Sequence, residues 1–271
     1  MRPETEKASA RPAAVAGLFY PADPGELRSV VAEYLDGASN NSLRAPKALI
    51  VPHAGYIYSG PVAAAAYATI AARRGTIRRV ALLGPSHRVY LHGIALPRWD
   101  AFATPLGEIP IDRERRSQLI ASGDVMSADA PHAQEHSLEV QLPFLQMLLG
   151  EFELLPLVAG SARPEHVAAV LAAVWEDNET LVLISSDLSH YHPYEEARAI
   201  DRDTSEAIVR RTTSLSGEQA CGAVCINGLL HLARERSHSV EEIMRNNSAD
   251  TAGDRQRVVG YGAFAIHESA H

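Results

Sequence analysis

Short apolar runs alternate along the chain with longer segments in which apolar residues recur at helical spacing. The runs are bounded by Pro, Gly or Ser and have the length of buried strands in a parallel sheet. They lie at residues 48–51, 79–83, 153–158, 180–185 and, with partial alternation, 258–266. Helical spacing is found at residues 62–72, 138–149, 165–175, 194–211 and 221–234. This alternation predicts a single α/β domain with a central, mostly parallel or mixed sheet flanked by helices.

The N-terminal region and two prolines refine this picture. Residues 1–15 are rich in Ala, Pro and charged side chains, so we expect a mobile N-terminal segment followed by one domain over residues 16–271. Asp23 and Pro24 are typical of the N-cap and the first position of a helix. Pro143 predicts a kink or a restart in the helix at 138–149.

Three of the strand-like segments are followed by a histidine, namely His53, His87 and His190. Ligands of open α/β sheets bind beyond the carboxyl ends of the strands, so these imidazoles could converge on one metal or substrate. Neutral imidazole is the commonest metal ligand among side chains. Each histidine taken alone is equally compatible with a hydrogen-bonded turn. Neither His53 nor His87 lies in a helical HExxH pattern, so the usual zinc-peptidase signature is absent there.

Further titratable residues lie near these histidines in the sequence. Glu135 and His136 precede Ser137, whose hydroxyl could cap the following helix and so explain part of the segment structurally. Glu135 and His136 themselves are candidates for a functional pair. Asp187 lies three residues before His190 and could fix its tautomer or raise its basicity.

The chain has two cysteines, Cys221 and Cys225, and their i,i+4 spacing is a poor framework for a disulfide. Cys221 is expected at the start of a helix, where the pKa of a thiol is lowered and the metal-binding thiolate is favoured. The alternative is a buried, apolar cysteine, which describes Cys225 better.

Composition narrows the class of protein. The chain of 271 residues has 25 Lys and Arg against 33 Asp and Glu, a net charge of −8, and no basic run with interleaved aromatics, so nucleic acid is not an expected partner. The charged N-terminus does not read as a signal peptide, and no apolar stretch approaches the roughly 20 residues needed to cross a bilayer. We therefore expect a cytoplasmic protein without a membrane partner.

With these segments in hand, the sequence resembles the Memo family, protein B of the AmmeMemoRadiSam system. The resemblance covers nearly the whole chain. It is carried by residues 16–21, 52–56, 83–87, 135–139, 185–187 with His190, 220–222, 250–254 and 258–261.

The resemblance implies a fold similar to that of class III extradiol dioxygenases, non-haem iron enzymes that open catechol-type rings. Carried over by motif, His53 and His87 match two metal-binding histidines and Cys221 matches the third ligand. His190 matches a histidine at the acid/base position, with His136 and Asp187 shaping the pocket. A thiolate in place of the dioxygenase carboxylate draws copper and zinc as well as iron, and we expect iron or copper, with zinc as the alternative.

Three functions stay open at this point. The chain is a metal-dependent redox enzyme acting on an unidentified small molecule, a binding or adaptor protein with a vestigial metal pocket, or a zinc hydrolase. The resemblance further implies an association with an AMMECR-type protein and a radical-SAM protein.

Overall fold

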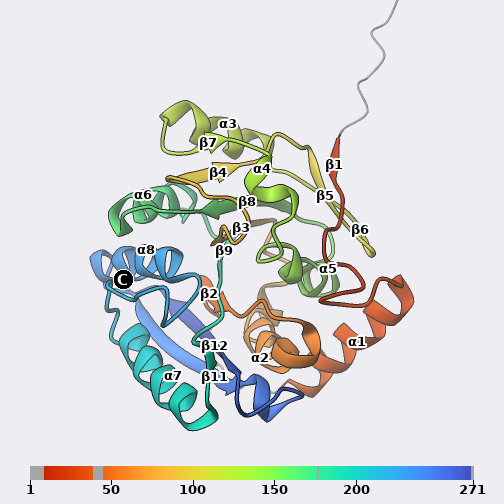
Figure 1. Cartoon of the computed structure of the whole chain (residues 1–271). Coiled ribbons are helices and arrows are strands. Elements are labelled where there is room, and N and C mark those ends of the chain that lie inside the picture. The colour runs from red at the N-terminus through yellow and green to blue at the C-terminus, as the bar shows by residue number, and fades with distance from the viewer. Residues whose placement is uncertain (1–8, 39–44, 176, 270–271) are drawn as a thin grey trace, which may run out of the picture.

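A mixed sheet runs through the centre of the molecule. The computed structural model describes residues 9–38, 45–175 and 177–269, and Figure 1 shows their arrangement. Along the sheet the strands are β10 (His190–His192), β12 (Val258–His267), β2 (Ala48–Val51), β9 (Thr180–Ser185), β3 (Arg79–Pro85), β8 (Glu153–Ala159), β4 (Ile94–Leu96) and β7 (Met126–Ser127), and β11 (Ser239–Asn247) pairs with β12. Strands β2, β9, β3 and β8 are parallel, whereas β12 and β4 pair with them antiparallel.

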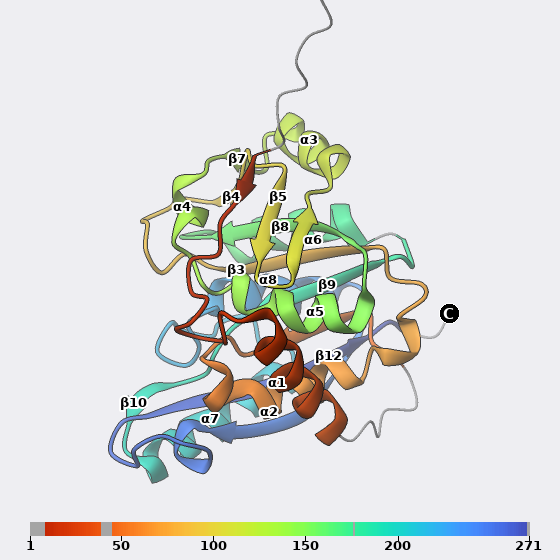
Figure 2. The same cartoon turned by 90° about the vertical axis from the view of Figure 1, so that its right-hand side faces the viewer.

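Helices cover both faces of this sheet. Helices α1 (Pro24–Gly37), α2 (Tyr56–Ala68) and α5 (Leu142–Leu149) lie on one face, and α6 (Pro164–Trp175), α7 (Tyr194–Val209) and α8 (Ala223–Glu235) contribute to the other (Figures 1 and 2). Successive residues of the central strands point to opposite faces, so Leu49 and Val51 join the first core while Ala48 and Ile50 join the second. The predicted α/β domain with a mixed sheet is confirmed.

A smaller sheet and two short helices extend the domain, and all of them except β1 are formed by residues between β3 and β8 in the sequence. Strands β1 (Ala10–Arg11), β5 (Ala101–Thr104) and β6 (Gly107–Pro110) form the three-stranded sheet. Helices α3 (Arg113–Ser122) and α4 (Ala130–Ala133) complete this region, for which the hydrophobic pattern made no prediction. Strands this short contain too few residues to show a period.

Several element boundaries follow the predictions and others depart from them. The strands at 48–51 and 180–185 have the predicted bounds, and Asp23 caps α1 by accepting hydrogen bonds from Gly25 N and Glu26 N. Helix α5 restarts at Leu142 after a short 3₁₀ segment, as Pro143 predicts. The helix predicted at 62–72 instead spans Tyr56–Ala68.

The start of the domain lies earlier than predicted. Residues 1–8 of the expected mobile segment lie outside the described residues. Within residues 9–15, Ala10 and Arg11 form β1 on β5, and the Arg11 side chain is fully buried. The packed domain therefore begins before residue 16.

Among the described residues, no helix combines the length and apolarity that crossing a bilayer requires.

Gly260 on β12 provides a test of this packing. A side-chain carbon at Gly260 would lie 2.0 Å from Asp201 Oδ2, whereas one at Gly37 would meet no atom within 4 Å. We expect Gly260→Ala to lower the free energy of unfolding in urea by about 1–3 kcal/mol, because the buried Asp201 must move. The control, Gly37→Ala, is expected to leave stability unchanged or slightly raised. Equal stability of the two variants would contradict the close approach of β12 and α7.

Candidate functional site

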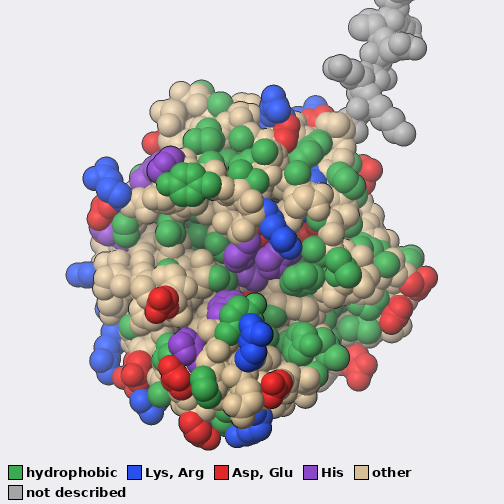
Figure 3. Space-filling model, viewed as in Figure 1, with side chains coloured by type: hydrophobic (Ala, Val, Ile, Leu, Met, Phe, Trp, Pro, Cys, Tyr) green, Lys and Arg blue, Asp and Glu red, His purple; other side chains and the backbone are tan. Residues whose placement is uncertain are grey.

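A cavity of about 1040 Å³ opens at the carboxyl ends of the central strands. The six residues that the sequence predicted as ligands or catalytic groups all contribute to its lining: His53, His87, His136, Asp187, His190 and Cys221. In Figure 3 histidine side chains gather in a hollow on this face of the molecule. The structure therefore brings the six residues together, and it leaves their chemical roles as proposals.

The order of the strands explains this convergence. His53 follows β2, Asp187 follows β9 and His87 follows β3, and β9 pairs in parallel with both other strands. Neighbouring strands lie about 4.8 Å apart, so β2 and β3 are separated by about twice that distance. The rings of His53 and His87 reach toward each other beyond the end of β9, and their centroids are 5.2 Å apart.

The tautomer of His53 is set by a serine hydroxyl. Ser185 Oγ donates to the carbonyl oxygen of Ser137 at 2.6 Å and accepts from Gln141 Nε2 at 2.8 Å. Its single proton is therefore in use, so His53 Nδ1, at 2.9 Å, must be the donor in the bond between them. The neutral ring then has an unprotonated Nε2. Burial lowers the pKa of His53 well below 6.5, which keeps the ring neutral.

A buried carboxylate sets the tautomer of His87 in the same sense. Glu135 Oε2 accepts from His87 N at 2.6 Å, and Glu135 Oε1 lies 2.9 Å from His87 Nδ1. Burial opposes the ionised form of Glu135, but hydrogen bonds from His87 and from the backbone of Ser137 outweigh it and lower the pKa of Glu135 to about 2. Because an ionised carboxylate only accepts, His87 Nδ1 donates and Nε2 is left as a ligand atom.

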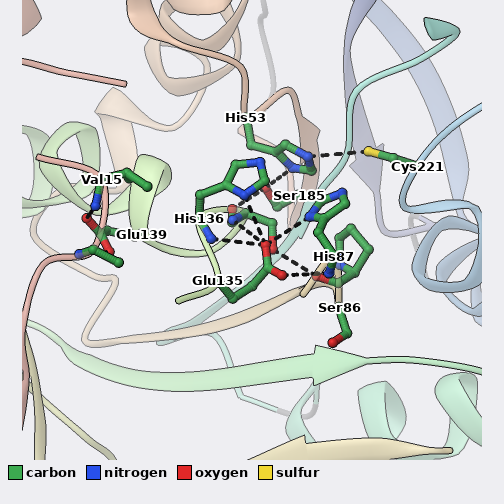
Figure 4. Close-up of polar contacts among 12 residues, drawn as sticks. Val15, His53, Ser86, His87, Glu135, His136, Glu139, Ser185 and Cys221 are labelled. Carbon is green, nitrogen blue, oxygen red and sulfur yellow. Dashed lines mark hydrogen bonds and ion pairs between the residues drawn. The ribbon is translucent and has the colours of Figure 1, made fainter. Parts of the chain in front are cut away.

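His136 completes a cluster of three imidazoles. One ligand atom each from His53, His87 and His136 lies within 4.8 Å of the others, and Figure 4 shows the rings facing a common space. His136 Nδ1 lies 3.3 Å from Glu135 Oε1 but outside hydrogen-bond geometry, so it has no hydrogen-bond partner in the described part of the chain. Such a group of donors is able to hold a metal ion.

Cys221 lies at the edge of this cluster. Its Sγ is 3.3 Å from His53 Nε2 and accepts a hydrogen bond from Asp187 N at 3.3 Å. The close packing of this segment requires glycine next to it, since a side-chain carbon at Gly222 would lie 2.7 Å from Ser186 Cβ. The backbone therefore presents the sulfur to the ring of His53.

The expected state of the Cys221 thiol needs correction. Helix α8 begins at Ala223, so Cys221 precedes the helix rather than starting it. Burial, reinforced by the nearby Asp187, raises the pKa of the Cys221 thiol to about 12 instead of lowering it. Without a cation beside it the group is a neutral thiol, and a bound metal would favour the thiolate.

Asp187 and His190 are not paired as the sequence suggested. Asp187 Oδ1 accepts from the backbone N of His53 at 2.7 Å, and burial raises the pKa of Asp187 to about 7. His190 Nδ1 instead lies 2.9 Å from the carbonyl oxygen of Leu188, which only accepts. The proton of the neutral ring is thus on Nδ1, and Nε2 is free to accept one. Asp187 positions the His53 backbone and does not set the tautomer of His190.

Sequence reasoning singled out Glu135, which orients His87, but gave no orienting role to the residues that bind His53 from behind. Ser185 was assigned to a strand and to a family motif, and Gln141 only to a helix. A usable signal was present, because Gln141 is a polar residue among apolar neighbours and is 1% exposed, with Ser185 fully buried. Buried polar groups need partners, so such residues are candidates for a network behind a site.

Nearly the whole chain is similar to known proteins. A family model described as Memo-like protein matches residues 11–265. The chain belongs to the Memo family. A MEMO1 family protein of Methanopyrus kandleri is 36% identical over 283 residues, covering 94% of this chain and 98% of that protein. A MEMO1 family protein of Aquifex aeolicus is 37% identical over 263 residues, covering 93% and 97%.

A solved structure supports the fold. An uncharacterised protein of Escherichia coli K12 aligns with a TM-score of 0.50 over 82% of this Memo-family chain and 100% of that chain, at 13% identity. The resemblance to the Memo family that the sequence motifs indicated is confirmed.

The buried histidines predict a pH dependence of stability. Burial lowers the pKa of His136 from 6.5 to about 4. As pH falls from about 6.5 to about 4, His136 binds a proton in the unfolded chain but stays neutral in the folded chain. The free energy of unfolding therefore decreases over this range. Between about pH 7 and about pH 4.5 we expect metal-free His136→Gln protein to lose roughly 1–3 kcal/mol less stability than the parent in urea titrations. An identical pH dependence of the two proteins would show that His136 is not the buried group inferred here.

Proposed function

We propose that this Memo-family chain is a metal-dependent redox enzyme that holds iron or copper with His53, His87 and Cys221. The observation that carries the proposal is the orientation of the two histidines. Ser185 and Glu135 occupy the Nδ1 positions, which leaves an unprotonated Nε2 on each ring. The Sγ of Cys221 lies 3.3 Å from one of these nitrogens, a separation that two ligands of a single metal can have.

In this proposal the other three predicted site residues, His136, Asp187 and His190, have roles other than binding the metal. His190 lines the same cavity and has an Nε2 that accepts a proton, so we assign it the acid/base role. Burial lowers the pKa of His190, so the ring is neutral and able to act as a base. Asp187 fixes the backbone at His53, and His136 forms part of the cavity wall. A bound iron or copper ion would supply one-electron and oxygen chemistry next to an unidentified small-molecule substrate.

A second candidate function is a zinc hydrolase. It is favoured by the cluster of His53, His87 and His136, because three histidines with an open fourth position are a donor set of catalytic zinc. In that case Cys221 would not bind the metal. A binding or adaptor role with a vestigial pocket is the further alternative, and it requires no bound metal.

Partners and location are part of the proposal. We propose association with an AMMECR-type protein and a radical-SAM protein, as the family resemblance implies, and a cytoplasmic location. The resemblance likewise supports a relation to class III extradiol dioxygenases. Co-purification of tagged protein with these two classes of partner would test the association.

The ligand set is tested by metal content after purification without added metal. We expect the parent protein to retain iron or copper and Cys221→Ser to lose most of it, with affinity falling at least about tenfold, because a soft thiolate is removed. Cys225→Ser, at a buried cysteine within α8, is the matched control and should retain the parent's metal content. Elemental analysis of each protein gives the measurement.

The same experiment separates the alternatives when His136→Gln is included. Loss of metal from His136→Gln but not from Cys221→Ser, with zinc as the bound ion, would favour the hydrolase. A parent protein of ordinary stability that binds none of these metals would favour the adaptor.

The acid/base role is tested by His190→Ala. We expect this variant to keep the parent's metal content and to lower oxygen uptake with catechol as the probe by about 10²–10⁴-fold, because a proton acceptor is removed. His192→Ala is the control, since His192 lines the same cavity and bonds Glu196. Loss of most bound metal from His190→Ala would make His190 a ligand instead.

A further inference from the structure

A fully buried ion pair lies behind the histidine cluster. Arg11 on β1 donates to Glu139 Oε2 at 2.6 Å, and both side chains are 0% exposed. The same carboxylate accepts from the backbone nitrogens of Ala14 and Val15 and from the hydroxyl of Tyr20. Glu139 thus binds four groups of the N-terminal region at one point.

Arg11 also binds the segment that carries Glu135 and His136. Its Nε donates to the carbonyl oxygen of His132 at 2.7 Å, and its second terminal nitrogen donates to the carbonyl oxygen of Glu135 at 2.6 Å. These carbonyls lie at and just beyond the end of α4, and the His132 carbonyl also accepts from the backbone nitrogen of Glu135 at 3.2 Å, so Arg11 bonds this turn in addition to the turn's own hydrogen bonds.

The guanidinium is enclosed on a further side. Arg11 Cζ lies 4.9 Å from the centroid of the Phe102 ring, and Phe102 is the β5 residue that pairs with Arg11. One planar group therefore fixes three acceptors at once, which the single ammonium of lysine cannot reproduce.

We propose that Arg11 is a positioning residue of the metal site. It holds the backbone of residues 132–136 so that the Glu135 carboxylate reaches His87 Nδ1 and His136 faces the cavity. Arg11, in strand β1 near the N-terminus, thereby helps to set the tautomer of His87. The part concerning metal affinity rests on the proposed function, whereas the part concerning the His87 tautomer does not.

The test compares Arg11→Lys with Arg98→Lys. Lysine at residue 11 keeps a positive charge opposite Glu139 but loses bonds to the carbonyls. The control changes an arginine whose side chain is 72% exposed and which binds Asp129 at the opposite end of α4. Two measurements are made: Co²⁺ affinity, and the fraction of His87 with its proton on Nδ1 in the metal-free protein, from ¹⁵N NMR of the imidazoles.

We expect Arg11→Lys to lower Co²⁺ affinity by about 10-fold or more and to reduce the Nδ1–H fraction of His87. Arg98→Lys should match the parent in both. If Arg11→Lys does not fold, Tyr20→Phe, which removes one donor from Glu139 and keeps the ion pair, should give smaller changes in the same direction.

The outcomes distinguish this inference from the proposed function. A parent protein that does not bind Co²⁺, with a His87 tautomer that still shifts in Arg11→Lys, would support the positioning role and overturn the metal site. A folded Arg11→Lys protein with unchanged tautomer would overturn the positioning role, whether or not its Co²⁺ affinity falls.

Discussion

The geometry of the cavity depends on one buried carboxylate. Glu135 accepts hydrogen bonds from the backbone and ring of His87 and from the backbone nitrogens of His136 and Ser137. A charge that is almost entirely removed from water is tolerated only when such donors surround it. These hydrogen bonds therefore fix the loop after β3 relative to the segment after α4, and with them the relative positions of His87 and His136.

The segment after α4 also orients His53, through neutral hydrogen-bonding groups. The carbonyl of Ser137 and the amide of Gln141 both bind Ser185 Oγ, which in turn orients His53. Gln141 is itself held by Tyr67, whose hydroxyl donates to its side-chain oxygen at 2.7 Å. Residues 135–141 thus orient two imidazoles. His87 is oriented by the ionised Glu135, and His53 by the neutral hydroxyl of Ser185. A buried network of this kind specifies a single arrangement because each member is satisfied only in that arrangement.

What the sequence could and could not predict follows from the range of the interactions. The strands at 48–51 and 180–185 are continuous apolar runs, and residues following parallel strands gather at one edge, so the convergence of His53, Asp187 and His87 was predictable. The state of the Cys221 thiol was not, because it depends on burial and on the carboxylate of Asp187 in the segment after β9. The early start of the domain was hidden for a similar reason, since Arg11 is buried against Glu139, two backbone carbonyls and the Phe102 ring, all distant from it in the sequence.

The place of β9 between β2 and β3 has a consequence for how the site is assembled. The two strands that precede the candidate ligand histidines are synthesised early, yet their common neighbour is residues 180–185. Closing such long loops is slow compared with forming local contacts, so this pairing belongs to the later steps of folding. Until β9 inserts, His53 lacks the serine that orients it and the cavity lacks Asp187, which follows β9. A nascent chain that has not yet delivered this strand consequently presents His53 without a fixed tautomer.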